Sequence, residues 1–173
     1  MMRLRSLLGT LAVALMLTVA GAASAHAQRF GGQLSWGSDS DVGVGARAEF
    51  NMTNVLSKTE PFSRAFIITQ FDYYFVDCPS GADCSYWELN PTLAIPITTT
   101  TLRPYLGAGL NIAHASVDVP GFGGGSDTET GVNLLAGLKF SIGTADAFSE
   151  ARISLGGGEQ LALSFGFLFG GRR

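Results

Sequence analysis

From residue 30 onward the chain repeats short segments in which every second residue is apolar. Residues 103–114, RPYLGAGLNIAH, show the pattern: apolar residues alternate with Arg, Tyr, Gly, Gly and Asn. Strict alternation is typical of a strand whose two faces meet different surroundings, and no segment has helical periodicity. The pattern predicts an all-β chain with eight strands, at 30–36, 42–50, 65–75, 87–95, 102–114, 130–141, 150–156 and 161–169.

The two faces of these segments suit lipid on one side and a narrow polar interior on the other. In a soluble barrel such as a lipocalin, the apolar face would be inside and the many glycines would be exposed, where they weaken a strand and pack against nothing. With the apolar face in lipid, the glycines make room for long polar side chains inside. A sheet in lipid has to close on itself, because lipid satisfies no open edge. The pattern therefore predicts an eight-stranded antiparallel up-and-down transmembrane β-barrel.

The predicted interior receives both acidic and basic side chains. Eight strands leave a lumen just wide enough for side chains to fill, so these charges have to pair with one another. We expect a salt-bridged plug and no continuous aqueous pore. The predicted lumen network consists of Arg47, Glu49, Gln70, Asp72, Glu88, Asn90, Arg103, Asn111, Asn133, Lys139, Glu150 and Arg152.

Aromatic residues at lipid-facing positions form two groups when both chain ends are placed on the periplasmic side. Such groups are expected as girdles at the two membrane interfaces; the alternative is that they are ordinary core aromatics. The group predicted at the outer rim is Trp36, Tyr73, Phe75 and Trp87, and the group at the periplasmic rim is Phe30, Phe50, Phe140, Phe167 and Phe169.

The first 27 residues have the organisation of a secretory signal peptide. Arg3 and Arg5 precede an apolar run over residues 7–20, and small residues with two A-x-A sites follow. The run is shorter than the roughly 20 residues that span a bilayer, which argues against the alternative of an uncleaved anchor. We expect cleavage after Ala27, export, and a barrel domain over residues 28–173.

Cys78 and Cys84 flank the turn-rich sequence PSGAD. An even number of cysteines in an exported chain favours a disulfide between them. The alternatives are a metal-binding pair or a redox pair. Both are weaker, because the spacing is not C-x-x-C and no histidine or further cysteine is near.

The predicted mature chain resembles the small eight-stranded outer-membrane β-barrels of the OmpA/OmpX/OmpW-like group, through "RPYLGAGLNIAH", "GVNLLAGLKFSI" and "LSFGFLF". The resemblance implies a bacterial outer membrane, contact with membrane lipid and lipopolysaccharide, and insertion by the barrel-assembly machinery. That machinery reads an aromatic-x-aromatic end of the last strand, which Phe167-Leu168-Phe169 matches. Two features depart from the family pattern: residues 170–173 follow that end, and Pro91 lies within a strand, where it removes a ladder hydrogen bond.

Charge and motif content exclude several classes of function. The net charge is -3 and the basic residues are scattered, which excludes a nucleic-acid-binding surface. No catalytic, cofactor or metal-binding motif is present. After cleavage His114 is the only histidine, and the alternation places it among lipid-facing residues near the outer interface. We therefore expect no enzyme activity, a rim-located lipid-modifying enzyme being the least favoured alternative.

Residues 116–130, SVDVPGFGGGSDTET, form the longest predicted outward loop. Asp118, Asp127 and Glu129 could bind a cation or a basic partner there, although the spacing is not that of an EF-hand; the alternative is an ordinary solvated loop. The predicted function is a structural or surface-interaction role with a plugged lumen. The alternative is a channel or transporter for small apolar molecules.

Overall fold

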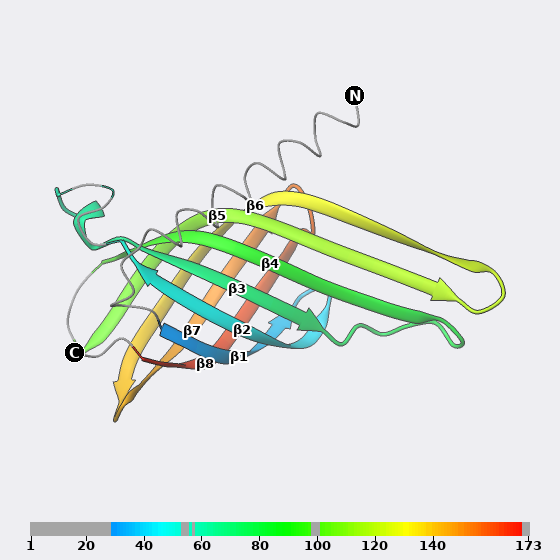
Figure 1. Ribbon diagram of the computed structural model, residues 1–173, viewed down its shortest axis with the longest axis horizontal. Coiled ribbons are helices and arrows are strands. Elements are labelled where there is room, and N and C mark those ends of the chain that lie inside the picture. Colours follow the sequence, from blue (N-terminus) through cyan, green and yellow to red (C-terminus); the bar gives the residue numbers. More distant parts are fainter. Residues whose placement is uncertain (1–28, 53–55, 57, 98–100, 171–173) are drawn as a thin grey trace.

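The computed structural model describes residues 29–52, 56, 58–97 and 101–170 as a closed antiparallel barrel (Figure 1). Each strand pairs with its neighbours in sequence, and pairing of β1 with β8 closes the barrel. The predicted signal peptide, with its cleavage site, lies outside the described residues. The strands are β1 (Arg29–Gly37), β2 (Asp41–Asn51), β3 (Phe66–Tyr74), β4 (Asp83–Pro96), β5 (Leu102–Val119), β6 (Gly123–Ile142), β7 (Ala145–Leu155) and β8 (Gln160–Phe169), with a short 3₁₀ helix, η1 (Phe62–Arg64), between β2 and β3.

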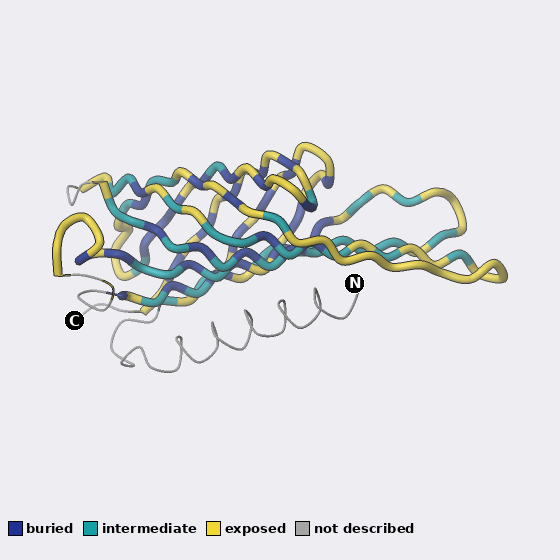
Figure 2. Tube along the Cα trace, turned by 90° about the horizontal axis from the view of Figure 1, so that it is seen from above, coloured by how far each residue is buried: buried dark blue, intermediate teal, exposed yellow. Residues whose placement is uncertain are grey.

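The predicted fold is confirmed, including the number and order of the strands. The exterior is apolar and the interior polar, which is the reverse of a soluble protein. Strand β8 alternates strictly between buried and exposed residues, and Figure 2 shows the same alternation around the barrel. Leu34 and Phe165 on the outside are 62% and 46% exposed, whereas Gln70 inside is 0% exposed. No helix among the described residues is long and apolar enough to cross a membrane.

Strands β5 and β6 are longer than the strands predicted at 102–114 and 130–141, and the prediction of a loop at 116–130 is wrong. Val119 pairs with Gly123, so only residues 120–122 form the turn and the rest of that segment is strand. The segment has few apolar residues because it extends beyond the barrel, where neither of its faces contacts lipid. Without a lipid-facing side the apolar alternation stops, although backbone pairing continues.

Three strands project from one end of the barrel and form what we call the projecting sheet (Figure 1). It consists of residues 83–85 of β4, 113–119 of β5 and 123–131 of β6. The β4 segment lies beyond the last pair with β3, the β6 segment lies beyond the last pair with β7, and the β5 segment lies between them. We call this end of the barrel the projecting end. The opposite end, where β1 begins and β8 ends, is the terminal end.

Glycines inside the barrel provide the space that large lumen side chains occupy. A Cβ atom at Gly137 would lie 2.1 Å from Cζ of Tyr105, and one at Gly166 would lie 2.8 Å from the Phe148 ring. Both distances are far below a van der Waals contact. The interior therefore depends on glycine facing an aromatic ring, as the sequence pattern of small and long residues predicted.

Pro91 interrupts the ladder between β4 and β5. Pairing runs to Leu89–Ile112 and resumes at Thr92–Gly109, with the same register on both sides. Proline has no N–H to donate, so the gap is local and leaves the strand order intact.

Candidate functional site: a charged lumen below a projecting sheet

The lumen contains two clusters of paired charges, and the first is centred on Arg47 of β2. Its guanidinium is 2.8 Å from Oε1 of Glu49 and 2.9 Å from Oε2 of Glu150. Lys139 of β6 lies 2.7 Å from the second oxygen of Glu49. Tyr105 donates its hydroxyl hydrogen to Glu150 over 2.8 Å. Strands from opposite walls therefore meet in one ion-pair network across the lumen.

The second cluster lies nearer the projecting end and is centred on Arg152 of β7. Its guanidinium is 2.6 Å from Glu88 of β4 and 3.3 Å from Asp72 of β3. Glu88 also accepts hydrogen bonds from the hydroxyl of Tyr86, at 2.7 Å, and from the amide of Gln160, at 2.5 Å. The amide of Asn90 also donates to it over 3.3 Å, so Glu88 is held by one cation and three neutral donors.

Gln70 joins the two clusters. Its amide nitrogen donates to Glu150 over 2.8 Å, and its carbonyl oxygen accepts from Arg152 over 3.4 Å. Because Gln70 belongs to β3, and Glu150 and Arg152 to β7, the network runs both along and across the lumen. The side chains thus form one connected plug over the central part of the barrel.

The described charges of the two clusters are nearly balanced. Three cations face four carboxylates, which leaves one excess negative charge. The excess negative charge is offset by neutral donors, including Gln33 and Ser35, which each donate to Asp72 over 2.7 Å. Buried ions require such pairing, because an unpaired one loses its hydration without compensation.

A layer of amides also lies in the lumen. Asn133 donates to Asn90 over 3.1 Å and accepts from the hydroxyl of Thr92 over 2.9 Å. Asn111 donates to the carbonyl of Gly157 over 2.7 Å, which holds the β7–β8 connection over the lumen. The predicted lumen asparagines are all fully buried.

Arg103 lies elsewhere than predicted, at the terminal mouth and not in the central network. Its guanidinium is 2.6 Å from Asp146, which also pairs with Arg29 at 2.5 Å. Its side chain is 29% exposed, whereas those of Arg47 and Arg152 are at most 1% exposed. Arg103 is the second residue of β5, so it lies at the rim of the barrel. The alternation indicates whether a residue faces lipid or the lumen, but not its depth in the barrel.

Sequence reasoning missed several lumen residues. Gln33 and Ser35 alternate with apolar neighbours in β1, so the same pattern could have identified them. Phe148 is apolar but lies two residues before Glu150, on the same face of β7; it is fully buried in the lumen with the Arg47 guanidinium 4.1 Å from its ring centre. Its strand was predicted to begin only at residue 150, whereas β7 begins at Ala145.

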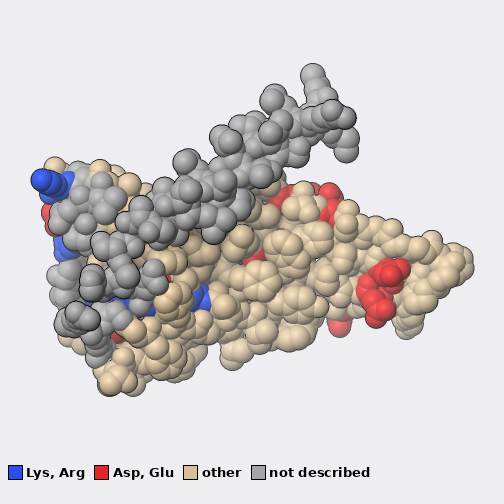
Figure 3. Space-filling view, viewed as in Figure 1, with Lys and Arg blue, Asp and Glu red and all other residues tan. Residues whose placement is uncertain are grey.

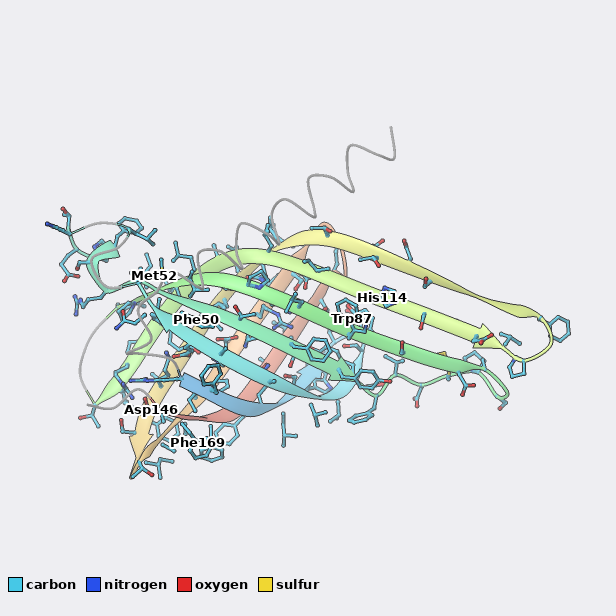
Figure 4. All side chains as sticks on the ribbon, in the orientation of Figure 1. Phe50, Met52, Trp87, His114, Asp146 and Phe169 are labelled. Atoms are coloured by element: carbon cyan, nitrogen blue, oxygen red, sulfur yellow. A yellow bond between two sulfur atoms is a disulfide. The ribbon has the colours of Figure 1, made fainter. Side chains whose placement is uncertain are left out.

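The predicted aromatic groups lie toward the two ends of the barrel. At the projecting end Tyr73 pairs with Trp87, Trp36 is the penultimate residue of β1, and Phe75 directly follows β3. At the terminal end Phe169 is the cross-strand neighbour of Phe30, whose ring contacts that of Phe50 with centroids 6.4 Å apart. Phe140 and Phe167 both pair with Ala147 there. Figure 4 shows Phe50 and Phe169 far from Trp87.

The outward face of β4–β6 changes from apolar to polar where these strands leave the barrel. Trp87, His114 and Thr128 are neighbours across the three strands. The imidazole of His114 stacks on Trp87 with ring centroids 5.1 Å apart, and its Nδ1 lies 2.7 Å from the Thr128 hydroxyl (Figure 4). The next row outward consists of hydroxyl side chains, Ser85, Ser116 and Ser126.

The three acids predicted for the outward loop do not converge. Asp127 and Glu129 share one face of β6, while the alternation of β5 places Asp118 on the opposite face of the sheet. The carboxylate of Glu129 accepts from the Gly158 amide over 3.0 Å. The described part of the chain contains no group of three or more His, Cys, Asp or Glu residues that could hold a metal ion.

The predicted disulfide between Cys78 and Cys84 is confirmed, with Cα atoms 5.8 Å apart. It joins the β3–β4 connection to the start of β4. The connection therefore stays close to the projecting sheet.

The two ends of the barrel carry opposite charge (Figure 3). At the terminal end Arg29, Lys58, Arg64 and Arg103 accompany two acids, and the hydrogen bond from Arg64 to Glu60 lowers the pKa of that carboxyl. At the projecting end the described residues include no Lys or Arg. The acids there are Asp39, Asp41, Asp77, Asp83, Asp118, Asp127, Glu129 and Glu159.

Several solved structures share this architecture. The N-terminal β-barrel domain of Pseudomonas aeruginosa OprF has 18% sequence identity and a TM-score of 0.56 over 83% of this chain and 98% of that one. Neisserial surface protein A has 17% identity and a TM-score of 0.53 over 82% and 92% of the two chains. Ail, the attachment invasion locus protein of Yersinia pestis, has 13% identity and a TM-score of 0.53 over 82% and 93%.

The chain has the fold of the small outer-membrane β-barrels. The resemblance predicted from the strand sequences is thereby confirmed at the level of the fold. No family model matches the sequence, and no curated protein matches it either. At identities this low the likeness concerns architecture alone.

Proposed function

We propose that this protein is an outer-membrane barrel with a closed lumen that binds a partner at the cell surface through the open edge of β6. The observation that carries the proposal is the pairing of β6. Residues Gly123–Gly131 pair with β5 on one side, while β7 begins to pair with β6 only at Val132. From Gly123 to Thr128 the other edge of the strand faces no described strand, and all these residues are exposed.

An open edge presents unpaired N–H and C=O groups, which an extended segment of another chain can pair with. Self-association along this edge is disfavoured, because antiparallel pairing of two β6 edges would bring their acidic side chains close together. Asp127 and Glu129 instead favour a segment that carries Lys or Arg. The proposed partner is therefore a basic, extended polypeptide segment.

The acidic projecting end also argues against polyanions as ligands. Ail has been crystallised in complex with sucrose octasulfate, a heparin analogue. In the present chain eight acids and no described basic residue lie at the projecting end. A sulfated sugar would meet electrostatic repulsion there, which makes a cationic partner the better match.

The exterior of the barrel supports placement in the outer membrane in contact with membrane lipid. The belt of exposed apolar residues ends in aromatic groups at both rims, as transmembrane barrels require. Beyond the outer aromatic row, the serine row would lie among lipopolysaccharide head groups. The last strand ends with Phe167 and Phe169 exposed at 40% and 59%, which supports recognition by the barrel-assembly machinery.

The proposal includes neither catalysis nor transport. The described charged groups of the lumen are engaged with one another, and His114 is engaged with Trp87 and Thr128. The alternative, passage of small apolar molecules, finds little support in a lumen filled by paired charges.

The decisive experiment is a binding measurement with two designed peptides, one alternating Lys with Thr and Val and the other with Glu in place of Lys. With the barrel folded in detergent, the basic peptide should shift the backbone amide signals of residues 123–128 and produce cross-strand contacts to β6. The acidic peptide should not bind. Equal binding of both peptides, or shifts that spare β6, would contradict the proposal.

A further inference from the structure

A cavity of about 280 Å³ opens on the lumen side of the projecting sheet. We call it the mouth pocket. Residues from several elements line it: Asp39 of the β1–β2 turn, Val76 after β3, Tyr86 of β4, Val117 of β5 and Glu159 of the β7–β8 connection. It is therefore distinct from the edge of β6, which contributes no residue to it.

The floor of the mouth pocket is closed. Gln160 is 6% exposed, and together with Tyr86 it donates a hydrogen bond to Glu88. Glu88 is in turn paired with Arg152. The side chains at the bottom of the pocket thus belong to the plug, so the pocket ends blindly and is suited to holding a molecule and not to passing it on.

The walls of the mouth pocket are mostly apolar. Val76, Ala115 and Val117 contribute aliphatic groups, and Tyr86 contributes its ring. At an aqueous surface such a concave apolar wall is stabilised by covering it with an apolar ligand group. The volume of about 280 Å³ has room for an aromatic ring together with a short side chain.

The charged residues of the pocket are Asp39 and Glu159, and both are acidic and exposed. Asp39 accepts a hydrogen bond from the Ser38 hydroxyl over 2.6 Å, and Glu159 accepts one from the Gly156 amide over 3.2 Å. No Lys or Arg is among the described residues that line the pocket. Both carboxylates can therefore take a further, cationic donor, and an anionic ligand would be repelled.

From the apolar walls, the blind floor and the two acids we infer that the mouth pocket is a binding site for a small organic amine. The apolar body of the ligand occupies the space between Val76, Tyr86 and Val117. Its ammonium group lies at the rim, within reach of Asp39 or Glu159. This site goes beyond the proposed binding of a polypeptide at the edge of β6 and does not depend on it.

The test uses three probes of nearly equal shape and different charge: 2-phenylethylamine, 2-phenylethanol and phenylacetate. The barrel is folded in a maltoside detergent, which has no ammonium head group to compete. Binding is followed through the amide signals of Ala115, Val117 and Glu159 and by calorimetry. The amine should bind saturably, the alcohol at least about tenfold more weakly because it lacks charge-assisted hydrogen bonds, and the acid not at all.

Two variants locate the site, and a third is the matched control. Asp39→Asn with Glu159→Gln should weaken amine binding about tenfold or more and leave binding of the alcohol unchanged. Ala115→Phe at an exposed strand position should fill the pocket and abolish binding of both. Asp118→Asn, on the other face of the sheet, should leave the amine affinity unchanged.

Folding of each variant is checked by comparing the gel mobility of unboiled and boiled samples, which differs for a folded barrel. The inference is overturned if no saturable binding occurs, if the alcohol binds as tightly as the amine, or if Ala115→Phe retains amine binding. The inference is also overturned if Asp118→Asn loses as much amine affinity as Asp39→Asn with Glu159→Gln. The loss in the double variant would then come from the overall charge and not from the pocket.

Discussion

At the scale of single residues, the lumen shows how far alternation can predict an interior. The pattern indicates which side of the wall a residue faces, so eleven of the twelve predicted lumen residues are buried, whereas Arg103 is at the rim. Which acid meets which base could not be predicted, because partners such as Arg47 and Glu150 are 103 residues apart and belong to opposite walls. Phe148 was missed because its strand was predicted to begin at residue 150, although it lies two residues before Glu150 and therefore on the same face of β7.

Replacing Arg152 by Ala should destabilise the barrel strongly. The change leaves Asp72 and Glu88 buried without their cation, and loss of one partner of a buried pair typically costs about 3 to 5 kcal/mol. The free energy of unfolding is measured by denaturant titration in detergent. Adding Glu88→Gln to the same chain should restore part of the loss, whereas Arg64→Ala at the exposed pair with Glu60 should change little. A wild-type-like stability of Arg152→Ala would show that the pair does not hold the plug.

Gly137→Ala should also destabilise the barrel, for a steric reason. The new methyl group would lie 2.1 Å from Cζ of Tyr105 and would displace a ring whose hydroxyl donates to Glu150. Overpacking of this kind typically costs about 1 to 3 kcal/mol. Gly125→Ala is the matched control, because nothing lies within 4 Å of its Cβ position. Equal unfolding midpoints of the two variants would show that the Tyr105 ring is not the reason for glycine at position 137.

At the scale of elements, the alternation predicted every strand of the barrel but failed where strands leave it. Inside the membrane each strand has one lipid face and one lumen face, and this contrast produces the pattern. In the projecting sheet no face contacts lipid, so the contrast between the two faces is absent. Gly123–Thr130 therefore resembles a loop in sequence although it pairs fully with β5. The open edge of β6, which carries the proposed function, therefore could not be predicted from the sequence.

Removing residues 117–125 and joining Ser116 to Ser126 through an Asn-Gly turn should leave the barrel folded. The two serines are already cross-strand partners, and β6 keeps all its pairs with β7. Heat-dependent gel mobility should be retained, while binding of the basic peptide should weaken strongly, because only Ser126–Thr128 of the free edge are left. A second variant, Asp127→Asn with Glu129→Gln, keeps the edge and should weaken binding without abolishing it. Retained binding after removal of the segment would place the partner site elsewhere.

At the scale of the whole molecule, closure and charge act together. A barrel of eight strands has no open edge within the membrane, and its interior is filled by two ion-pair clusters that Gln70 joins. The same closure leaves the projecting sheet as the part with an unpaired edge, at the end that carries only acidic groups among its described charges. The fold thereby separates a barrel with a filled lumen from a projecting sheet whose edge strand β6 is open.

The sealed lumen can be tested by electrical recording from the protein in planar bilayers. Wild-type protein should show little or no steady conductance, because a hydrated ion would have to displace Arg47, Arg152 and the carboxylates that pair with them. Heat-dependent gel mobility of the same preparation shows that the barrel is folded. The silent trace is then a property of the closed lumen and not of unfolded protein. Large, stable single-channel steps from the wild-type protein would contradict the plug and would make a porin the better interpretation, since a conducting path cannot coexist with this network of side chains.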